Sequence, residues 1–253
     1  MTSSSEPGAR PPANSSPNTP PPAQRLLALS GVAFAVLLVF GWFLSGGDTP
    51  DYTATDQDWT NWADDNRSNS GIAAFLVLLA GSALLFFAAT IRDVLGSAET
   101  TFPGAVQLSR VASAGAVVGA AAIATAIVMV AAATSEGADA DPVVSRAVAG
   151  ATTAGPYLVA AMGFAALLGA AGLVTLRSGV FPRWTGIVAL VGAVAFLITF
   201  LTLIAGTGED SVFGYGFLPG ILALVIWSAA TSIAEYRAVA TSTREPAPGE
   251  LEG

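Results

Sequence analysis

The sequence LLALSGVAFAVLLVFGWFLSG, residues 26–46, decides the class of fold. It follows Arg25 and contains no Asp, Glu, Lys or Arg. About 20 apolar residues are enough for a helix to cross the hydrocarbon core of a membrane. A secretory signal has a shorter apolar core, of roughly 7 to 15 residues. The stretch therefore predicts an uncleaved first transmembrane helix at 26–45.

The rest of the chain repeats this pattern. Of its 253 residues 53% are hydrophobic and only 11% are charged, whereas charged residues make up about 25% of a soluble domain. Further apolar segments of similar length, each without a charge in its interior, lie at 71–91, 111–134, 155–176, 186–206 and 218–235. We therefore expect an all-α fold, a polytopic transmembrane bundle of six helices spanning residues 25–237.

Arginine placement predicts the orientation of the bundle. If both termini are cytoplasmic, eight arginines lie inside and only Arg67 and Arg146 lie outside, as the positive-inside rule requires. The outer loops instead collect acidic residues, which account for much of the net charge of -8. Residues 1–24 and 238–253 are rich in Ser, Pro, Ala and Glu with little to bury, so we expect disordered cytoplasmic tails.

The outer loop 53–71, TATDQDWTNWADDNRSNSG, predicts a helix at 56–69 that lies at the membrane surface. Thr55 and Asp58 match a capping box, and the helix either turns or continues into the next span at Gly71. Trp59 and Trp62 share one face, which we expect to contact lipid headgroups. Trp42 and Trp184, at the ends of other spans, are expected to be interfacial anchors of the same kind.

A second outer helix is expected at 142–153. Asp141 is a good N-cap, and Pro142 suits the first helical turn. The pair Gly155-Pro156 should separate this helix from the span that follows, either as an architectural kink or as a break that exposes backbone to a ligand.

The segment SVFGYGFLPG, residues 211–220, contains a Gly-Tyr-Gly similar to a potassium-channel filter, but too few residues precede it for a pore helix. A tight outer turn is the preferred interpretation, with Pro219 at the first position of the last helix.

The absence of several residue types narrows the chemistry. The chain has no His, Cys or Lys, so it lacks the usual metal ligand, thiol nucleophile and serine-activating bases. Asp56, Asp58, Asp64 and Asp65 lack the spacing of a calcium loop. With no basic stripe, nucleic-acid binding has no support. We therefore expect no enzyme, no cofactor and no metal site.

Small and polar residues inside the spans suggest packing or solute contact. Gly115 and Gly119 form a GxxxG pattern, which allows two helices to approach closely, within the chain or between two copies. Thr199, Thr202, Trp227 and Thr231 are candidates for an interior that faces a solute. The loops TIRDVLGSAETTFPGAVQLSR and TLRSGVFPRWTG share features that suggest duplicated hairpins, although any positive-inside loop with a proline would look similar.

The order of these parts, with patches such as DWTNWADDNRSNSG, DPVVSRAV and RSGVFPRWTGIVALVGAV, resembles a family of uncharacterised multi-pass membrane proteins frequent in actinobacteria, a domain of unknown function. The resemblance covers roughly residues 25–235 and implies a compact six-helix protein of a bacterial plasma membrane. It brings no catalytic or binding residue with it. We expect a non-enzymatic interaction, regulatory or envelope-associated component that contacts the lipid bilayer and a membrane-protein partner or a second copy. The alternative is a transporter for a small neutral or lipophilic solute.

Overall fold

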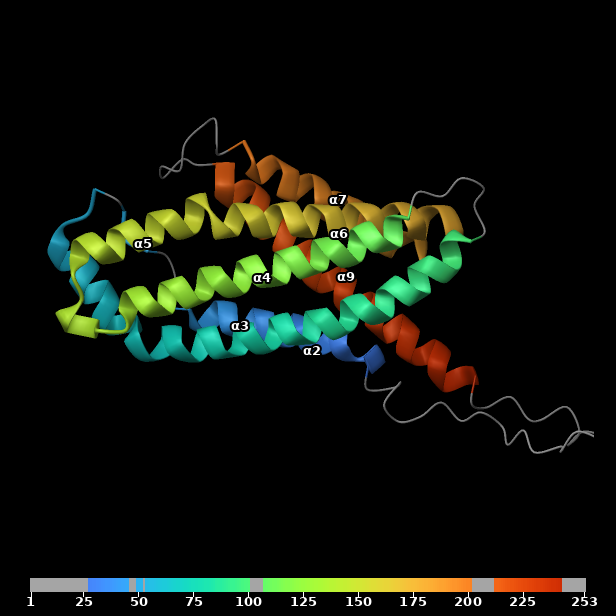
Figure 1. Cartoon of the computed structure of the whole chain (residues 1–253), viewed down its shortest axis with the longest axis horizontal. Coiled ribbons are helices and arrows are strands. Elements are labelled where there is room, and N and C mark those ends of the chain that lie inside the picture. Colours follow the sequence, from blue (N-terminus) through green and yellow to red (C-terminus); the bar gives the residue numbers. More distant parts are fainter. Residues whose placement is uncertain (1–26, 46–48, 52, 101–106, 202–211, 243–253) are drawn as a thin grey trace, which may run out of the picture.

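The computed structural model describes residues 27–45, 49–51, 53–100, 107–201 and 212–242. Within these segments every regular element is a helix, and the helices run roughly along one common axis (Figure 1). The helices are α2 (Ser30–Leu44), α3 (Asp56–Glu99), α4 (Leu108–Thr134), the 3-10 turn η1 (Gly137–Asp139), α5 (Pro142–Ala154), α6 (Pro156–Ser178), α7 (Arg183–Thr199) and α9 (Val212–Ser242).

Six of the helices form a closed ring. Around it α2 packs against α3, α3 against α4, α4 against α6, α6 against α7, α7 against α9, and α9 returns to α2. Large apolar side chains fill the centre, and the most deeply buried include Phe34, Leu84, Phe87, Phe164, Phe196 and Trp227. The short helix α5 lies at one end of the ring, in contact with α3, α4 and α6 (Figure 1).

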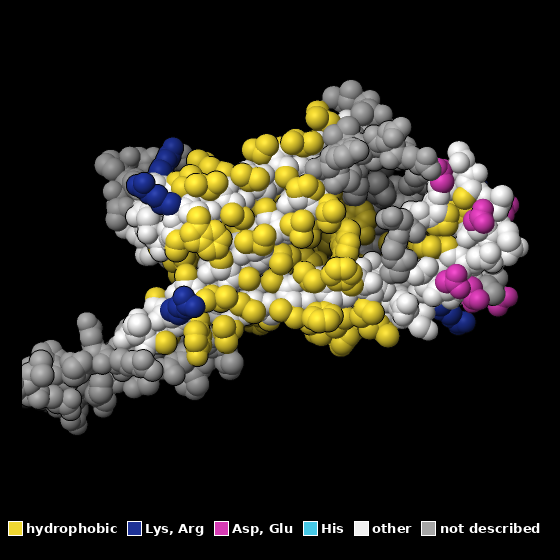
Figure 2. Space-filling view, turned by 180° about the vertical axis from the view of Figure 1, so that it is seen from behind, with side chains coloured by type: hydrophobic (Ala, Val, Ile, Leu, Met, Phe, Trp, Pro, Cys, Tyr) yellow, Lys and Arg dark blue, Asp and Glu magenta, His cyan; other side chains and the backbone are white. Residues whose placement is uncertain are grey.

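The outer surface of the ring is apolar. Four helical stretches are long and apolar enough to cross a membrane, namely Asp56–Glu99, Leu108–Thr134, Pro142–Ser178, which comprises α5 and α6, and Gly216–Thr241. Figure 2 shows a belt of hydrophobic side chains with acidic side chains gathered at one end and arginines towards the other. Large exposed aliphatic and aromatic side chains occur on every helix of the ring, as lipid contact requires. The chain is thus a multi-pass membrane protein whose helices contact the bilayer.

Two helices of the ring are shorter. The apolar helices Ser30–Leu44 and Arg183–Thr199 are shorter than the predicted spans 26–45 and 186–206. The described residues Leu29, Ser45 and Phe200 lie just beyond the ends of these helices, whereas residue 26 and residues 202–206 lie outside the described part of the chain. The predicted tail 1–24 also lies outside it. At the other terminus α9 continues to Ser242, beyond the predicted end of the last span at 235 and into the predicted tail at 238–253.

Two expected helix boundaries are confirmed, although α3 ends at Glu99 instead of the predicted 91. The capping box of Thr55 and Asp58 is confirmed at the start of α3, which then continues through Gly71 without a break. No Gly or Pro occurs between 56 and 70 to end the helix earlier. The break at Gly155 is also confirmed, since α5 ends at Ala154 and α6 begins at Pro156.

The expected outer turn before Pro219 is wrong, because α9 already begins at Val212 and Pro219 lies inside it. Packing explains why the helix tolerates the proline. A Cβ added to Gly216 would lie 2.6 Å from the Ala195 carbonyl oxygen, so this first part of α9 is pressed directly against α7. Tertiary contact therefore outweighs the hydrogen bond that Pro219 cannot make.

Candidate functional site

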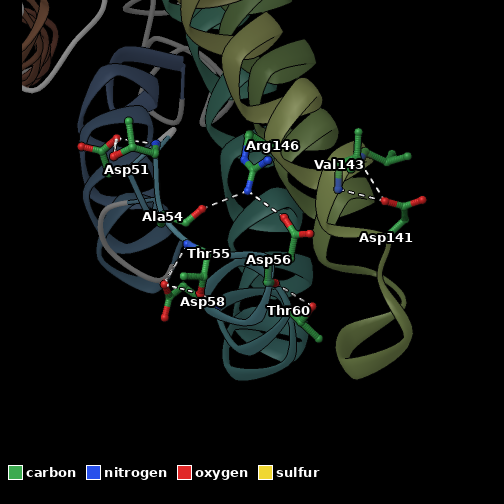
Figure 3. A network of polar contacts seen from close by, with 11 residues as sticks. Asp51, Ala54, Thr55, Asp56, Asp58, Thr60, Asp141, Val143 and Arg146 are labelled. Atoms are coloured by element: carbon green, nitrogen blue, oxygen red, sulfur yellow. Dashed lines mark hydrogen bonds and ion pairs between the residues drawn. The ribbon is translucent and has the colours of Figure 1, made fainter.

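The end of the bundle that carries most of the acidic side chains is organised around Arg146 of α5 (Figure 3). Its guanidinium donates to the Asp56 carboxylate and to the carbonyl oxygen of Ala54, each at 3.0 Å. It also lies over the ring of Trp59, 5.7 Å from the centroid, as in a cation–π contact. Ser145, next to it, donates to the Ala133 carbonyl at the end of α4. These contacts fix α5 to the beginning of α3 and the end of α4.

The beginning of α3 is fixed locally by the capping box. The Thr55 hydroxyl donates to the Asp58 carboxylate at 2.7 Å, and the Thr55 backbone N–H donates to the same oxygen at 3.0 Å. In return the Thr55 hydroxyl oxygen accepts from the Asp58 N–H. The hydrogen bond from the Thr55 hydroxyl has the larger effect and that from the Thr55 backbone N–H the smaller, and both hold the pKa of the Asp58 carboxyl below its ordinary value.

The expected headgroup contact of Trp59 and Trp62 is corrected by the structure. Both indoles are buried by protein, Trp59 completely and Trp62 to all but 8%, in a small cluster with Ala140 and Ala149. The rings meet edge to face, 5.7 Å apart. The helical period placed them correctly on one face, but α5 and the turn before it cover that face instead of lipid. Trp42 and Trp184 remain exposed by 37% and 51%.

A cavity of about 430 Å³ lies beside this cluster. That size is typical of small-molecule sites, which are mostly apolar with a few polar groups. The cavity is lined by four aromatic residues (Trp42, Phe43, Trp62, Tyr157), by aliphatic side chains (Leu38, Val77, Ile123, Ile127, Val130, Ala149) and by three hydroxyl residues (Ser45, Thr49, Thr152). None of these described lining residues is charged. They come from α2, α3, α4, α5 and α6 and from the residues just after α2. Most are buried between the helices, but Phe43 is 81% exposed, so the cavity reaches the surface beside α2.

An aromatic cluster separates this space from α9. Phe217 stacks on Trp42 with centroids 6.0 Å apart, and Tyr157 meets the Phe217 ring edge to face at 5.3 Å. Phe217 is almost fully buried. The rings of Trp42 and Tyr157 therefore line the cavity on one side and hold α9 on the other.

The residues expected to face a solute do not line this cavity. Trp227, Thr231 and Thr199 are fully buried, and the two hydroxyls donate to carbonyls of their own helices, Thr231 to Trp227 and Thr199 to Ala195. Trp227 packs edge to face on Phe87 with centroids 5.5 Å apart. Thr202 lies outside the described residues. The hydroxyls were a poor guide because a membrane helix can satisfy them internally.

The two glycines of the GxxxG pattern lie between α4 and α6. A Cβ on Gly115 would stand 2.5 Å from the Gly163 carbonyl oxygen, and one on Gly119 would collide with the Phe164 ring. Gly163 faces them from α6, so the two backbones touch. Within this chain the pattern thus forms a packing contact between neighbouring helices of the ring.

The acidic residues do not gather into a metal site in the part of the chain that the structure describes. No group of three or more metal-ligating side chains occurs there. Asp56 forms an ion pair with Arg146, and Asp58 is part of the capping box at the start of α3.

The cavity itself was missed from the sequence. Leu38, Ile123 and Ile127 have nothing in their local pattern that separates them from lipid-facing neighbours, and only the closure of the ring brings them together. The one sequence feature that could have indicated the position of the cavity is the pair Gly155-Pro156, because α5 ends and α6 begins there, between the lining residues Thr152 and Tyr157.

No protein-family model matches the chain, and no curated protein or solved structure shows significant similarity to it.

Proposed function

We propose that the protein is a non-enzymatic, six-span component of a bacterial plasma membrane, with an interaction, regulatory or envelope-associated role. The observation that carries this proposal is the closed helical ring with a packed centre. Small residues bring the backbones of α4 and α6 into contact, and aromatic rings fill the space between the helices. Of the buried polar side chains described, only Glu99 carries a charge, and it lies at a helix end rather than in the centre. A proton relay through the core would require ionisable groups there.

Two further observations support six spans with cytoplasmic termini. The helices α2 and α7 have 15 and 17 residues, or roughly 22 and 25 Å at 1.5 Å per residue, and both belong to the ring of longer helices. Arg92, Arg110, Arg177 and Arg183 belong to the helix ends opposite the acidic end, as expected if that side faces the cytoplasm.

The orientation is tested with two cysteines on one helix. The chain has no native cysteine, so Asp65→Cys and Asp93→Cys each provide a single thiol, and both positions are exposed at opposite ends of α3. An impermeant thiol reagent should label the first variant and not the second in intact cells. Both should react after permeabilisation. The reverse pattern would overturn the orientation.

The interaction role is tested by photocrosslinking from the acidic end, with the crosslinker at Asp65. A specific protein adduct or a second copy of the chain should be captured in the native membrane, and the same crosslinker at lipid-facing Val191 should capture neither. Equal capture from both positions would contradict a specific contact at this end.

A transporter for a small neutral or lipophilic solute is the second candidate. The cavity, whose described lining residues are uncharged, favours it. Protein reconstituted into vesicles would then take up a neutral solute with saturation, and filling the cavity with Ile127→Phe would abolish the uptake. Such a result would replace the interaction role.

A further inference from the structure

We propose that the cavity binds one apolar chain of an uncharged amphiphile whose head carries hydroxyl groups, such as a monoacylglycerol. This inference goes beyond the interaction role, since that role requires no ligand. It rests on the shape of the cavity, the chemistry of its lining and the charge around its mouth.

The cavity extends along α3. Trp62 and Val77 both line it and are 15 residues apart on α3, which is about 22 Å along a helix at 1.5 Å per residue. An uncharged, mostly apolar space that extends along the helix axis suits a hydrocarbon chain. The deeper lining is aliphatic, with Leu38, Ile123 and Ile127 around Val77.

The polar groups lie where the head of such a molecule would be. Ser45 and Thr49 follow the outer end of α2, and Thr152 lies in the last turn of α5. The hydroxyls of Ser45 and Thr152 already donate to carbonyl oxygens of their own segments, at 2.7 and 2.8 Å. Their oxygens keep lone pairs, so they can accept further hydrogen bonds. A head with O–H donors complements them.

The charges around the cavity favour a ligand with an uncharged head group. None of the described lining residues could pair with a charge, and an unpaired charge in such a space is costly. The same end of the bundle carries acidic side chains, including Asp51, two residues after Thr49, and Asp58, and these would disfavour an anionic lipid or a fatty-acid carboxylate. A neutral hydroxylated head avoids both penalties.

The helix α5 provides Ala149 and Thr152 to the wall of the cavity. Gly155 joins it to α6 with φ -120° and ψ -90°, outside the helical region, and Arg146 attaches it to Asp56 on the far side.

The test uses the full chain in phosphatidylcholine nanodiscs and a monoacylglycerol with a photoreactive diazirine in its chain. Labelling of peptides that contain Val77 and Ile127 should saturate, and unlabelled monoacylglycerol should compete about tenfold better than the fatty-acid anion of the same chain. Ile127→Phe, which fills the cavity, should lower the saturable labelling by at least about fivefold. Val128→Phe, at the neighbouring position that is 46% exposed on the outer face, should leave it unchanged.

A second blocking variant, Ala149→Leu, keeps the proposal open to refutation if Ile127→Phe does not fold. Labelling that never saturates, or that persists in both folded blocking variants, would overturn the site. Equal competition by the fatty-acid anion would overturn the neutral head. The cysteine and photocrosslinking results depend on neither outcome, so failure of this ligand is distinguishable from failure of the proposed role.

Discussion

Arg146 and Asp56 are 90 residues apart in sequence, yet their side chains form an ion pair of 3.0 Å at the acidic end of the bundle. The pair is partly exposed, with 28% of the Arg146 side chain and 68% of the Asp56 side chain accessible. By itself such a pair contributes little, about 0 to 1 kcal/mol. Its importance is positional, because it joins the helix that covers the cavity to the first turn of α3.

Replacing Arg146 should loosen α5. Arg146→Gln removes the ion pair and the contact with Trp59, each worth up to about 1 kcal/mol at a partly exposed site. A cysteine at Thr152, which is buried in the cavity wall, should then react with a thiol reagent up to about tenfold faster. Arg67→Gln is the matched control, because Arg67 forms no ion pair with any described residue. Equal rates in the two variants would show that Arg146 does not hold α5.

The start of α3 should respond to pH through Asp58. Its pKa is lower when folded, so the stabilisation is fully present above the unfolded value of about 3.9 and is lost as the pH falls through the folded pKa. Carbon NMR of Asp-labelled protein should show the Asp58 signal, identified by its loss in Asp58→Asn, titrating below that value. Thr55→Ala should raise the midpoint. Thr60→Ala should not, because the Thr60 hydroxyl bonds only to its own helix at Asp56.

Two glycines should respond to alanine with opposite signs. At Gly115 a methyl group would be forced against the backbone of α6, so Gly115→Ala should destabilise the protein by about 1 to 3 kcal/mol. At Gly71 no atom lies within 4 Å of the added carbon, and alanine in a helix is better than glycine by about 0.5 to 1 kcal/mol. Unfolding from nanodiscs followed by circular dichroism compares the two variants. If both variants shift the stability in the same direction, the close approach of α4 and α6 does not require a glycine at position 115.

The features that could be predicted from the sequence are those that depend only on residues close together in the chain. The capping box needs only Thr55 and Asp58, and the break before α6 needs only Gly155 and Pro156, so both could be predicted without tertiary information. The apolar periods of the long helices are local in the same sense. The membrane class of the chain followed from them directly.

What could not be predicted depends on which helices meet. Trp59 and Trp62 have the spacing of a surface stripe, but the stripe is covered by α5, which follows about 80 residues later. A proline such as Pro219 is typical of the first turn of a helix, but packing against α7 lets α9 begin seven residues earlier, at Val212. The cavity needs side chains from five helices, and no short stretch of sequence encodes their meeting.

Glu99 offers a last test, at the opposite end of the bundle. It ends α3, is 8% exposed, and its carboxylate accepts from the backbone N–H of Ser109 at 2.6 Å and from the Ser109 hydroxyl at 2.9 Å. The side chain of Gln107, the N-cap residue of α4, makes no capping hydrogen bond. Glu99, which belongs to α3, accepts the hydrogen bond from the first turn of α4 instead. A negative group at a helix N-terminus also favours the helix dipole.

Removing this carboxylate should therefore destabilise the start of α4. Hydrogen bonds to a charged group contribute about 1.5 to 3 kcal/mol, so Glu99→Ala should lose an amount of this order, and Glu99→Gln, which keeps an acceptor without the charge, should lose less. Hydrogen exchange of the amides at 109–112 gives a local readout beside global unfolding. Asp93→Ala, at an exposed acid on the same helix, is the control and should change neither. Unaltered exchange in Glu99→Ala would mean that the first turn of α4 is held by packing alone.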